Sequence, residues 1–492
     1  MAQAVLHARR VVAVGLIYGA AVELGLALKV PGVDIAMFWP AAGVGATLMV
    51  LALRRSRAQA ASVALAIAGL NLLLNLVGHN TLAMSAGYTV ANTVEPLVAG
   101  LAYARLRRTR TAPAMTMPCL IVAALAGVLP SSALAVGLLR GGGEPWWQTA
   151  ANFGVPDFSS IVVVGSLIVV PHRLDLRRWP EATAQAGVLA ALCAVAYWFT
   201  TGLHVGWLPL PALMWAAMRL GTTWTAVSSS GLAVTVAVAA SHNRGAFGDS
   251  AHRFTDLIAS QGFATVAVFM AMTMAAVVVE REQAARALAL SDPLTGVGNR
   301  RYLVEQAPQL LGGGRHEGTL VGLFFCDLNG FKAINDAHGH EAGDEVLRQV
   351  AQRLAAVVRR SDVVARLGGD EFVVLCPDIY AASEVEKIAA RLEAVLTEPI
   401  LVGGRTLAVT ASVGVAMQTR PTSLPELMAR ADAEMYRNKS TGRPSALPPV
   451  PRGGAEIDPV AMTASRMATS TTVAATATAT VERRRLPGRS PR

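Results

Sequence analysis

The sequence predicts two structural classes in one chain: a multi-span α-helical membrane domain, followed by an α+β domain of the ferredoxin-like type. The chain is 53% hydrophobic and only 15% charged over 492 residues. Lys, Asp and Glu are sparse between residues 11 and 279, and charge returns to normal globular density from Glu280. Beyond that point, β-type runs alternate with helical runs, as in an α+β sandwich.

This change in composition predicts four parts along the chain. Residues 1–280 form a multi-pass membrane domain, and residues 281–291 form a helical connector of strong helix formers without Gly or Pro. Residues 292–445 form the α+β domain. Residues 446–492, rich in Ala, Thr, Pro and Arg, form a disordered basic tail.

Apolar runs of spanning length, or near it, predict about ten membrane helices, or about eight if the seventh to ninth runs merge. The runs lie at about 11–29, 35–53, 59–77, 84–104, 117–138, 155–171, 185–202, 205–219, 222–240 and 259–279. Arginine clusters fall in every other gap between them. The positive-inside rule therefore predicts an even number of spans, with both termini in the cytoplasm.

The net charge of +10 does not indicate a nucleic-acid partner, because the arginines concentrate in short loops between apolar runs and in the last residues. The four cysteines are scattered without a CxxC pair. This pattern predicts neither a disulfide framework nor a zinc site.

Carboxylates inside the apolar runs are costly in a membrane, so they are candidates for function. Glu23 and Glu95 are the candidates for intramembrane sensing, and Asp157, Asn71, Asn75 and Asn92 are further polar groups in the spans. The alternative is that such groups only hold helices together through hydrogen bonds.

The membrane half also resembles a known sensor type. Phe38–Gly43, Ala91–Pro96 and Leu213–Gly221 are similar to motifs of the bacterial MASE-type integral membrane sensor domain, which precedes signalling output domains. The resemblance implies a sensory role. The connector would then pass a movement of the last span to the next domain, although a plain tether is the alternative.

In the soluble half, two short β-type runs flank Gly368-Gly369-Asp370-Glu371. The Gly-Gly pair predicts a hairpin turn with positive φ. Asp370 and Glu371 then lie together at this turn, which suits a divalent cation held against phosphate. An ordinary exposed turn with two solvated acids is the alternative.

A second corner of the same kind follows the buried run 319–326. Asp327 ends this predicted strand, and Gly330 and Lys332 come shortly after it. Backbone N–H groups from Gly330 to Lys332 could face phosphate oxygens beside the acid.

Six motifs in one order and spacing then resemble the GGDEF domain of diguanylate cyclases over about residues 290–445. They are Asp292–Gly296, Asp327–Asp336, Gly339–Asp344, Gly368–Phe372, Ser412–Ala416 and Lys439–Arg443. The resemblance implies a nucleotide-cyclase-like fold and condensation of two GTP molecules to cyclic di-GMP and two pyrophosphates. It implies catalysis by a homodimer at the bacterial inner membrane, in contact with lipid.

The resemblance also implies roles for single residues. Asp327, the Leu328 carbonyl, Asp370 and Glu371 would bind two Mg²⁺ ions, with Mn²⁺ as a substitute, and Asp370 and Glu371 would be catalytic. The residues that would contact GTP are Gly330, Phe331, Lys332, Asn335, Asp344, Lys439 and Arg443, with Asn335 and Asp344 reading guanine.

Arg359 and Asp362 match the family's RxxD motif, which implies a site where cyclic di-GMP binds back as an inhibitor. A solvated helix end is the alternative for this motif. For the whole domain, the alternative is a catalytically silent receptor that binds GTP or cyclic di-GMP, and a transporter with a regulatory appendage is the other class considered.

Overall fold

The computed structural model describes residues 2–28, 38–77, 81–138, 145–169, 175–199, 205–247, 253–312, 319–418 and 422–441. Arg443 and the predicted tail lie outside these residues. The chain divides into two compact units with the boundary between Ala287 and Leu288. The four-part division of the chain stays a prediction, but α10 runs unbroken from Arg253 to Leu290 through most of the predicted connector.

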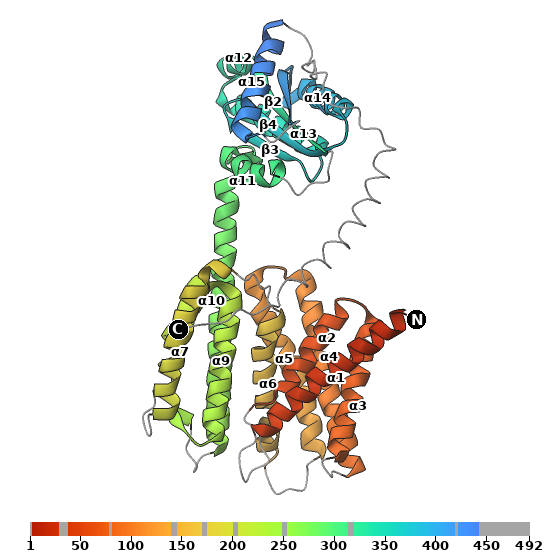
Figure 1. Cartoon of the computed structure of the whole chain (residues 1–492), viewed down its shortest axis with the longest axis vertical. Helices are drawn as coiled ribbons and strands as arrows, with labels where there is room; N and C mark the ends of the chain where they lie inside the picture. The colour runs from red at the N-terminus through yellow and green to blue at the C-terminus, as the bar shows by residue number, and fades with distance from the viewer. Residues whose placement is uncertain are drawn as a thin grey trace, which may run out of the picture. The chain divides into compact units, whose positions relative to one another are not determined.

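The first unit is a bundle of helices (Figure 1). Its α-helices are α1 Ala2–Ala27, α2 Pro40–Leu53, α3 Arg57–Val77, α4 Leu82–Thr109, α5 Thr116–Leu138, α6 Trp146–Val169, α7 Trp179–Ala194, α8 Leu210–Trp215, α9 Gly221–Ser241 and α10. Short 3₁₀ segments (Pro113–Met115, Leu176–Arg178, Gly245–Phe247) and π segments (Val195–Phe199, Ala216–Leu220) extend or join them.

Six helical stretches among the described residues are long and apolar enough to cross a membrane, as expected of a membrane protein. Two shorter apolar helices, Ala13–Ala27 and Pro40–Leu53, accompany them. The runs predicted at 205–219 and 222–240 belong to one such stretch, Leu210–Ser241. Gly221, at φ +78°, separates its two parts, and Gly206 lies beside Ala246 and Phe247. The helical segments before and after Gly221 therefore lie antiparallel to each other. The exact number of spans stays a prediction.

Small residues set the close packing of α2 with α4 and α6. The Gly43 amide donates to Ser160 Oγ at 3.0 Å, and a Cβ at Gly100 would lie 2.6 Å from Met49 Cγ. Such close approach is typical of packed membrane helices, which gain little from the hydrophobic effect within lipid.

The second unit contains a five-stranded sheet with the order β1-β3-β4-β2-β7. Its strands are β1 Gly298–Asn299, β2 Leu320–Asn329, β3 Val363–Gly368, β4 Glu371–Ile379 and β7 Thr410–Gln418, and β5 Ile400–Val402 and β6 Arg405–Leu407 form a separate hairpin. The four longer strands pair antiparallel. Their order, with helices after β2 and β4, is the predicted ferredoxin-like arrangement, extended at one edge by the parallel strand β1.

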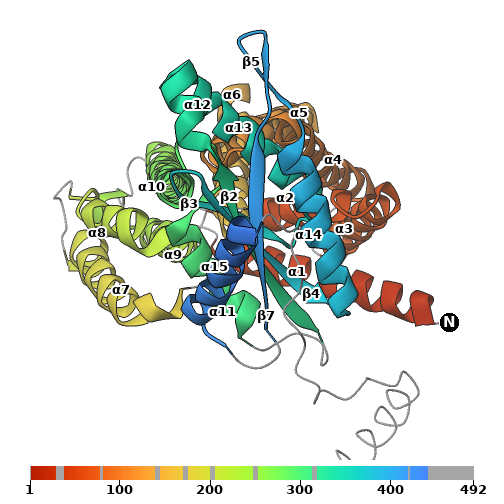
Figure 2. The same ribbon diagram turned by 90° about the horizontal axis from the view of Figure 1, so that it is seen from above.

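Helices cover both faces of this sheet. Residues of α13 His340–Val357 and α14 Ala382–Thr397 pack on the face that carries Phe324, Cys326 and Phe372. Residues of α11 Arg300–Leu311 and α15 Leu424–Thr441 pack on the opposite face, against Phe325 and Val373. Figure 2 shows α14 and α15 on either side of β7. The alternation of side chains along each strand produces these two faces.

Two helices were not predicted from the sequence. The first is α11, which Asn299 caps by accepting a hydrogen bond from the Tyr302 amide at 3.0 Å. The second is α12 Phe331–His338, which begins at Gly330 in the left-handed region, at φ +72°. An Asn N-cap before an apolar pattern could have revealed the first.

Gly414 is required where β7 meets α15. A Cβ at this position would lie 2.0 Å from the Ala431 carbonyl oxygen and 2.3 Å from the Met435 amide nitrogen, both in the backbone. Backbone cannot move aside as a flexible side chain can, so Gly414→Ala is expected to destabilise this unit by about 1–3 kcal/mol or more. Urea-dependent hydrogen exchange of β7 amides in the full-length protein measures this.

The matched control is Gly322→Ala in β2, whose nearest obstacle is the flexible end of Ile379 at 2.9 Å. We expect it to cost less. Equal protection factors for the Gly414→Ala variant and the wild type would contradict this prediction. They would show that β7 and α15 can move apart to admit the Cβ at no cost in stability.

Candidate active site

Strand pairing brings the predicted acids together at one end of the sheet. In the antiparallel pair of β2 and β4, Asp327 lies directly opposite Glu371. Residues so paired point to the same face with Cβ atoms about 5 Å apart. Asp370 precedes Glu371 in the tight turn after Gly369, which has φ +55°. Asp327 and Glu371, from two distant motifs, are therefore paired at this end of the sheet, with Asp370 next in the chain.

The mutual repulsion of these carboxylates acts on Glu371. Partial burial and the neighbouring carboxylates of Asp327 and Asp370 raise the pKa of Glu371 above its ordinary value. Two such charges about 5 Å apart repel by about 3 kcal/mol at an effective dielectric constant of about 20. A divalent cation would remove this penalty, and hard carboxylate oxygens are the ligands that Mg²⁺ prefers.

The donor chemistry therefore fits Mg²⁺, although the described residues hold no preformed group of three His, Cys, Asp or Glu side chains around a metal position. Lys439 on α15 instead forms an ion pair with Asp327. The sequence assigned Lys439 to phosphate and Asp327 to metal, so this contact between them was not predicted. In this state, the ammonium group supplies the positive charge beside Asp327.

The predicted phosphate corner follows β2 directly. The Leu328 side chain is buried in the core of this unit. Gly330 turns the chain into α12, and Phe331 and Lys332 form its first turn, with Lys332 exposed. Free N–H groups and a cation at a helix start are suited to phosphate.

Asn335 and Asp344, the predicted guanine-reading pair, lie on neighbouring helices α12 and α13. Asn335 Oδ1 lies only 1.9 Å from where a Cβ on Gly343 would be, so Gly343 lets the amide approach α13. Asn335 and Asp344 are both half-buried. The structure thus places Asn335 against the residue that precedes Asp344.

One polar link at this site was not predicted. Arg366 donates from Nε and Nη2 to the Gly369 carbonyl at 2.9 and 2.7 Å, inside the turn that carries the acids. Its Nη1 donates to Asp292 Oδ1 at 3.0 Å. Asp292 also accepts from the Thr295 amide and hydroxyl. The link therefore joins the turn to the segment that follows α10.

The predicted inhibitory residues are occupied by contacts of their own. The Arg359 guanidinium forms an ion pair with Glu384 of α14, with Nη2 and Oε1 2.6 Å apart. Asp362 Oδ2 accepts from the Arg359 amide at 2.7 Å. The two side chains are close in the chain, but they do not converge on one another. Glu384 is a partner that the sequence pattern did not reveal.

The two intramembrane candidates differ in their surroundings. Glu23 is exposed on the surface of its helix bundle, whereas Glu95 is 1% exposed and lies in the bundle interior. Glu95 Oε2 accepts from Ser131 Oγ of α5 at 2.8 Å. Of the two, only Glu95 has the buried environment in which a carboxylate needs a specific partner.

Residues 289–445 match the family model described as "Diguanylate cyclase, GGDEF domain". The chain is 31% identical over 307 residues to the bifunctional diguanylate cyclase/cyclic di-GMP phosphodiesterase MucR of Pseudomonas aeruginosa, which covers 61% of this chain and 41% of that protein. It is 42% identical over 160 residues to the response regulator PleD of Caulobacter vibrioides, which covers 32% of this chain and 35% of that protein.

Among solved structures, the coiled coil and GGDEF domain of DgcB from Caulobacter crescentus, in complex with c-di-GMP, is 29% identical with a TM-score of 0.32. It covers 34% of this chain and 89% of that chain. The chain spans less than half the length of the two curated relatives. Residues 289–445 thus carry a GGDEF domain of the diguanylate cyclase family, in the setting of cyclic di-GMP signalling. The likeness of the first unit to a MASE-type sensor stays a prediction.

The Asp292–Arg366 pair is expected to stabilise this unit in a pH-dependent way. Hydrogen bonds from Thr295 and Arg366 lower the pKa of Asp292 despite its partial burial. An acid with a lowered pKa stabilises the fold above its unfolded value and loses that contribution as pH falls. Asp292→Asn should therefore cost about 1–2 kcal/mol at neutral pH, and this cost should shrink below about pH 4.

Urea-dependent hydrogen exchange of β3 and β4 in the full-length protein measures this cost. Asp336→Asn, at an exposed carboxylate of α12, serves as the control and should change little at either pH. A cost for Asp292→Asn that stays constant from neutral to acidic pH would contradict the ionic role of Asp292.

Proposed function

We propose that this protein is a membrane-bound diguanylate cyclase that condenses two GTP molecules to cyclic di-GMP and two pyrophosphates. The observation that carries the proposal is the pairing of Asp327 in β2 with Glu371 in β4, next to Asp370. The pair lies at the end of the sheet where α12 begins. This arrangement supports a site where carboxylates and a phosphate-binding helix start face the same triphosphate.

The reaction needs two identical steps. In each step, the 3′-hydroxyl oxygen of one GTP forms a bond to the α-phosphorus of the other, while the bond from that phosphorus to the pyrophosphate breaks. The hydroxyl proton leaves the attacking oxygen, and Asp370 and Glu371 would be the carboxylates that accept it. Each domain binds one GTP, so catalysis requires two copies of the chain facing each other.

Mg²⁺, held by Asp327, the Leu328 carbonyl, Asp370 and Glu371, would neutralise the triphosphate and stabilise charge on the attacking and leaving oxygens, and Mn²⁺ could serve in its place. Lys332, Lys439 and Arg443 would bind phosphates, with Gly330 and Phe331 shaping the corner. Asn335 and Asp344 would read the guanine edge. Lys439 would leave Asp327 to reach a phosphate, which would free that carboxylate for the cation.

The membrane unit would act as the sensor, in the bacterial inner membrane among lipids, with both termini and the GGDEF domain in the cytoplasm. The alternation of arginine-rich gaps and the six long apolar helices support this placement. Cyclic di-GMP would be both product and inhibitor, through Arg359 and Asp362.

A second candidate is a catalytically silent receptor for GTP or cyclic di-GMP. The ion pair of Lys439 with Asp327, and the lack of three converging metal ligands among the described residues, favour it. The two candidates differ in one measurable respect, because only the enzyme forms product from GTP.

The first test is GTP turnover by the full-length protein in detergent with Mg²⁺, with products separated by chromatography. Asp370→Asn should lower the rate of cyclic di-GMP formation by about a hundredfold or more, because it removes a charge from the reacting centre. Glu386→Gln, at an exposed carboxylate of α14, is the charge-matched control and should keep full activity. Binding of GTP without any product from the wild type would establish the receptor instead.

Product inhibition tests the RxxD residues in both directions. Arg359→Ala should raise the inhibitory concentration of cyclic di-GMP by about tenfold to a hundredfold, because charge-assisted hydrogen bonds are lost. Glu384→Gln should instead lower it by up to about fivefold, because Arg359 is released from a competing carboxylate. Inhibition curves of purified variants measure both, and unchanged curves for both variants would exclude Arg359 from the inhibitory site.

A further inference from the structure

Three neighbouring helices of the first unit each carry a proline next to a buried polar residue. Pro96 follows Glu95 in α4, Pro130 precedes Ser131 in α5, and Pro156 precedes Asp157 in α6. A proline inside a helix removes one backbone hydrogen bond and bends the helix. These prolines lie next to the residues that place polar side chains in the bundle interior.

Glu95 and Asp157 meet there as a pair. They are 1% and 6% exposed, and each acts electrostatically on the other. Two ionised carboxylates so near one another in a buried site repel strongly, so a single proton between them relieves the repulsion. Ser131 donates to Glu95 Oε2 at 2.8 Å, whereas Glu95 Oε1 has no hydrogen-bond partner.

No cation among the described residues acts on this pair. Tyr18 of α1 is the further titratable group near it, and its hydroxyl is hydrogen-bonded to Asn71 of α3. From α2, Gly45 lies against the rings of both Tyr18 and Pro96. The sequences of α2, α5 and α9 contain no charged residue, and α3, which packs on α4, carries only Arg57, at its first position. Arg54 and Arg107 lie towards Tyr103, at least two turns beyond Glu95 along the helices.

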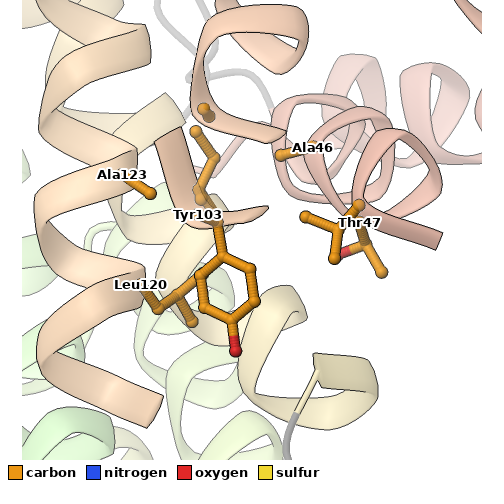
Figure 3. A pocket seen from close by; sticks show the side chains of 8 residues that line it. Ala46, Thr47, Tyr103, Leu120 and Ala123 are labelled. Atoms are coloured by element: carbon orange, nitrogen blue, oxygen red, sulfur yellow. The ribbon is translucent and has the colours of Figure 1, made fainter. Parts of the chain in front are cut away.

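A small cavity lies one helical turn away on the same helices (Figure 3). Its volume is about 10 Å³, enough for about one water molecule. Ala99 and Ile161, each four residues beyond an acid of the pair, line it together with Thr47 and Tyr103. Thr47 and Tyr103 are 2% and 1% exposed, and neither hydroxyl has a hydrogen-bond partner. The surface that lines this space is apolar, so the cavity leaves room beside the acids without offering hydrogen-bond partners to a water.

We propose that Glu95 and Asp157 form a proton-binding site inside the membrane unit, with one proton shared by the two carboxyl groups. When the proton is released to water, the acid and a water molecule become a carboxylate and hydronium. Loss of the proton leaves two buried anions side by side, which repel strongly at low dielectric. Deprotonation would therefore push α4 and α6 apart, so the site makes this bundle responsive to pH.

Infrared difference spectroscopy of the full-length protein in lipid nanodiscs tests this directly. Raising the pH from about 5 to about 9 should remove a carboxylic-acid C=O band of a buried group and produce a carboxylate band. Glu95→Gln and Asp157→Asn should each abolish this change. Glu23→Gln, at the exposed carboxylate of α1, is the matched control and should retain it. The band does not depend on nucleotide turnover, so the outcome is separate from that of the proposed cyclase function.

The Ser131→Ala variant keeps both acids, so it tests the proposal even if the variants of the acids fail to fold. It removes the hydrogen-bond donor that favours the ionised form of Glu95. The carboxylic-acid band should therefore still be present, and it should be lost at a higher pH than in the wild type. A band that is unchanged across the whole pH range would overturn the proposal, because the acids would then be permanently protonated contacts between helices. A pH-dependent band that survives in both Glu95→Gln and Asp157→Asn would overturn it as well.

Discussion

The register of β2 against β4 is the constraint on which the rest of the second unit depends. It sets Asp327 opposite Glu371, and a slip of one residue would turn one of the two acids to the other face of the sheet. The same register places Phe324 and Phe372 in one core and Phe325 and Val373 in the other. The apolar layers on both faces therefore hold two repelling carboxylates together, and core packing supplies the free energy that the acids cost.

Sequence patterns predicted the parts of this unit that follow from local chemistry. The Gly-Gly turn, the buried strand that ends in Asp327, and the helices α13 and α14 all follow from hydrophobic period and turn residues, whereas α11 and α12 were missed. The pairings of Lys439 with Asp327 and of Arg359 with Glu384 could not be predicted in this way. Each joins residues from elements far apart in the chain, and many surface cations could have served equally well. The length of the membrane spans was similarly ambiguous, because one apolar stretch turns back at Gly221.

Arg366 gives the turn with the acids a second attachment. Its guanidinium bonds the Gly369 carbonyl and Asp292, while Asn299 donates from its side chain to the Ala289 and Ser291 carbonyls. The end of α10, the segment after it and the Gly-Gly turn are therefore joined by directional hydrogen bonds within one unit. A rotation of the helix end would strain these bonds, whereas a flexible tether would leave the turn undisturbed. These bonds are the contacts through which the predicted connector would act on the turn.

Both units place carboxylates close together, but they differ in what can relieve the repulsion. At the end of the sheet, Asp370 and Glu371 are only half-buried, so hydrated cations and a triphosphate could reach them. The flexible side chain of Lys439 could also withdraw from Asp327. In the helix bundle, Glu95 and Asp157 are almost fully enclosed. A metal ion would have to lose most of its hydration to enter, whereas a proton needs no such space. The difference in accessibility therefore supports the two ligands proposed, a divalent cation at the end of the sheet and a proton in the bundle.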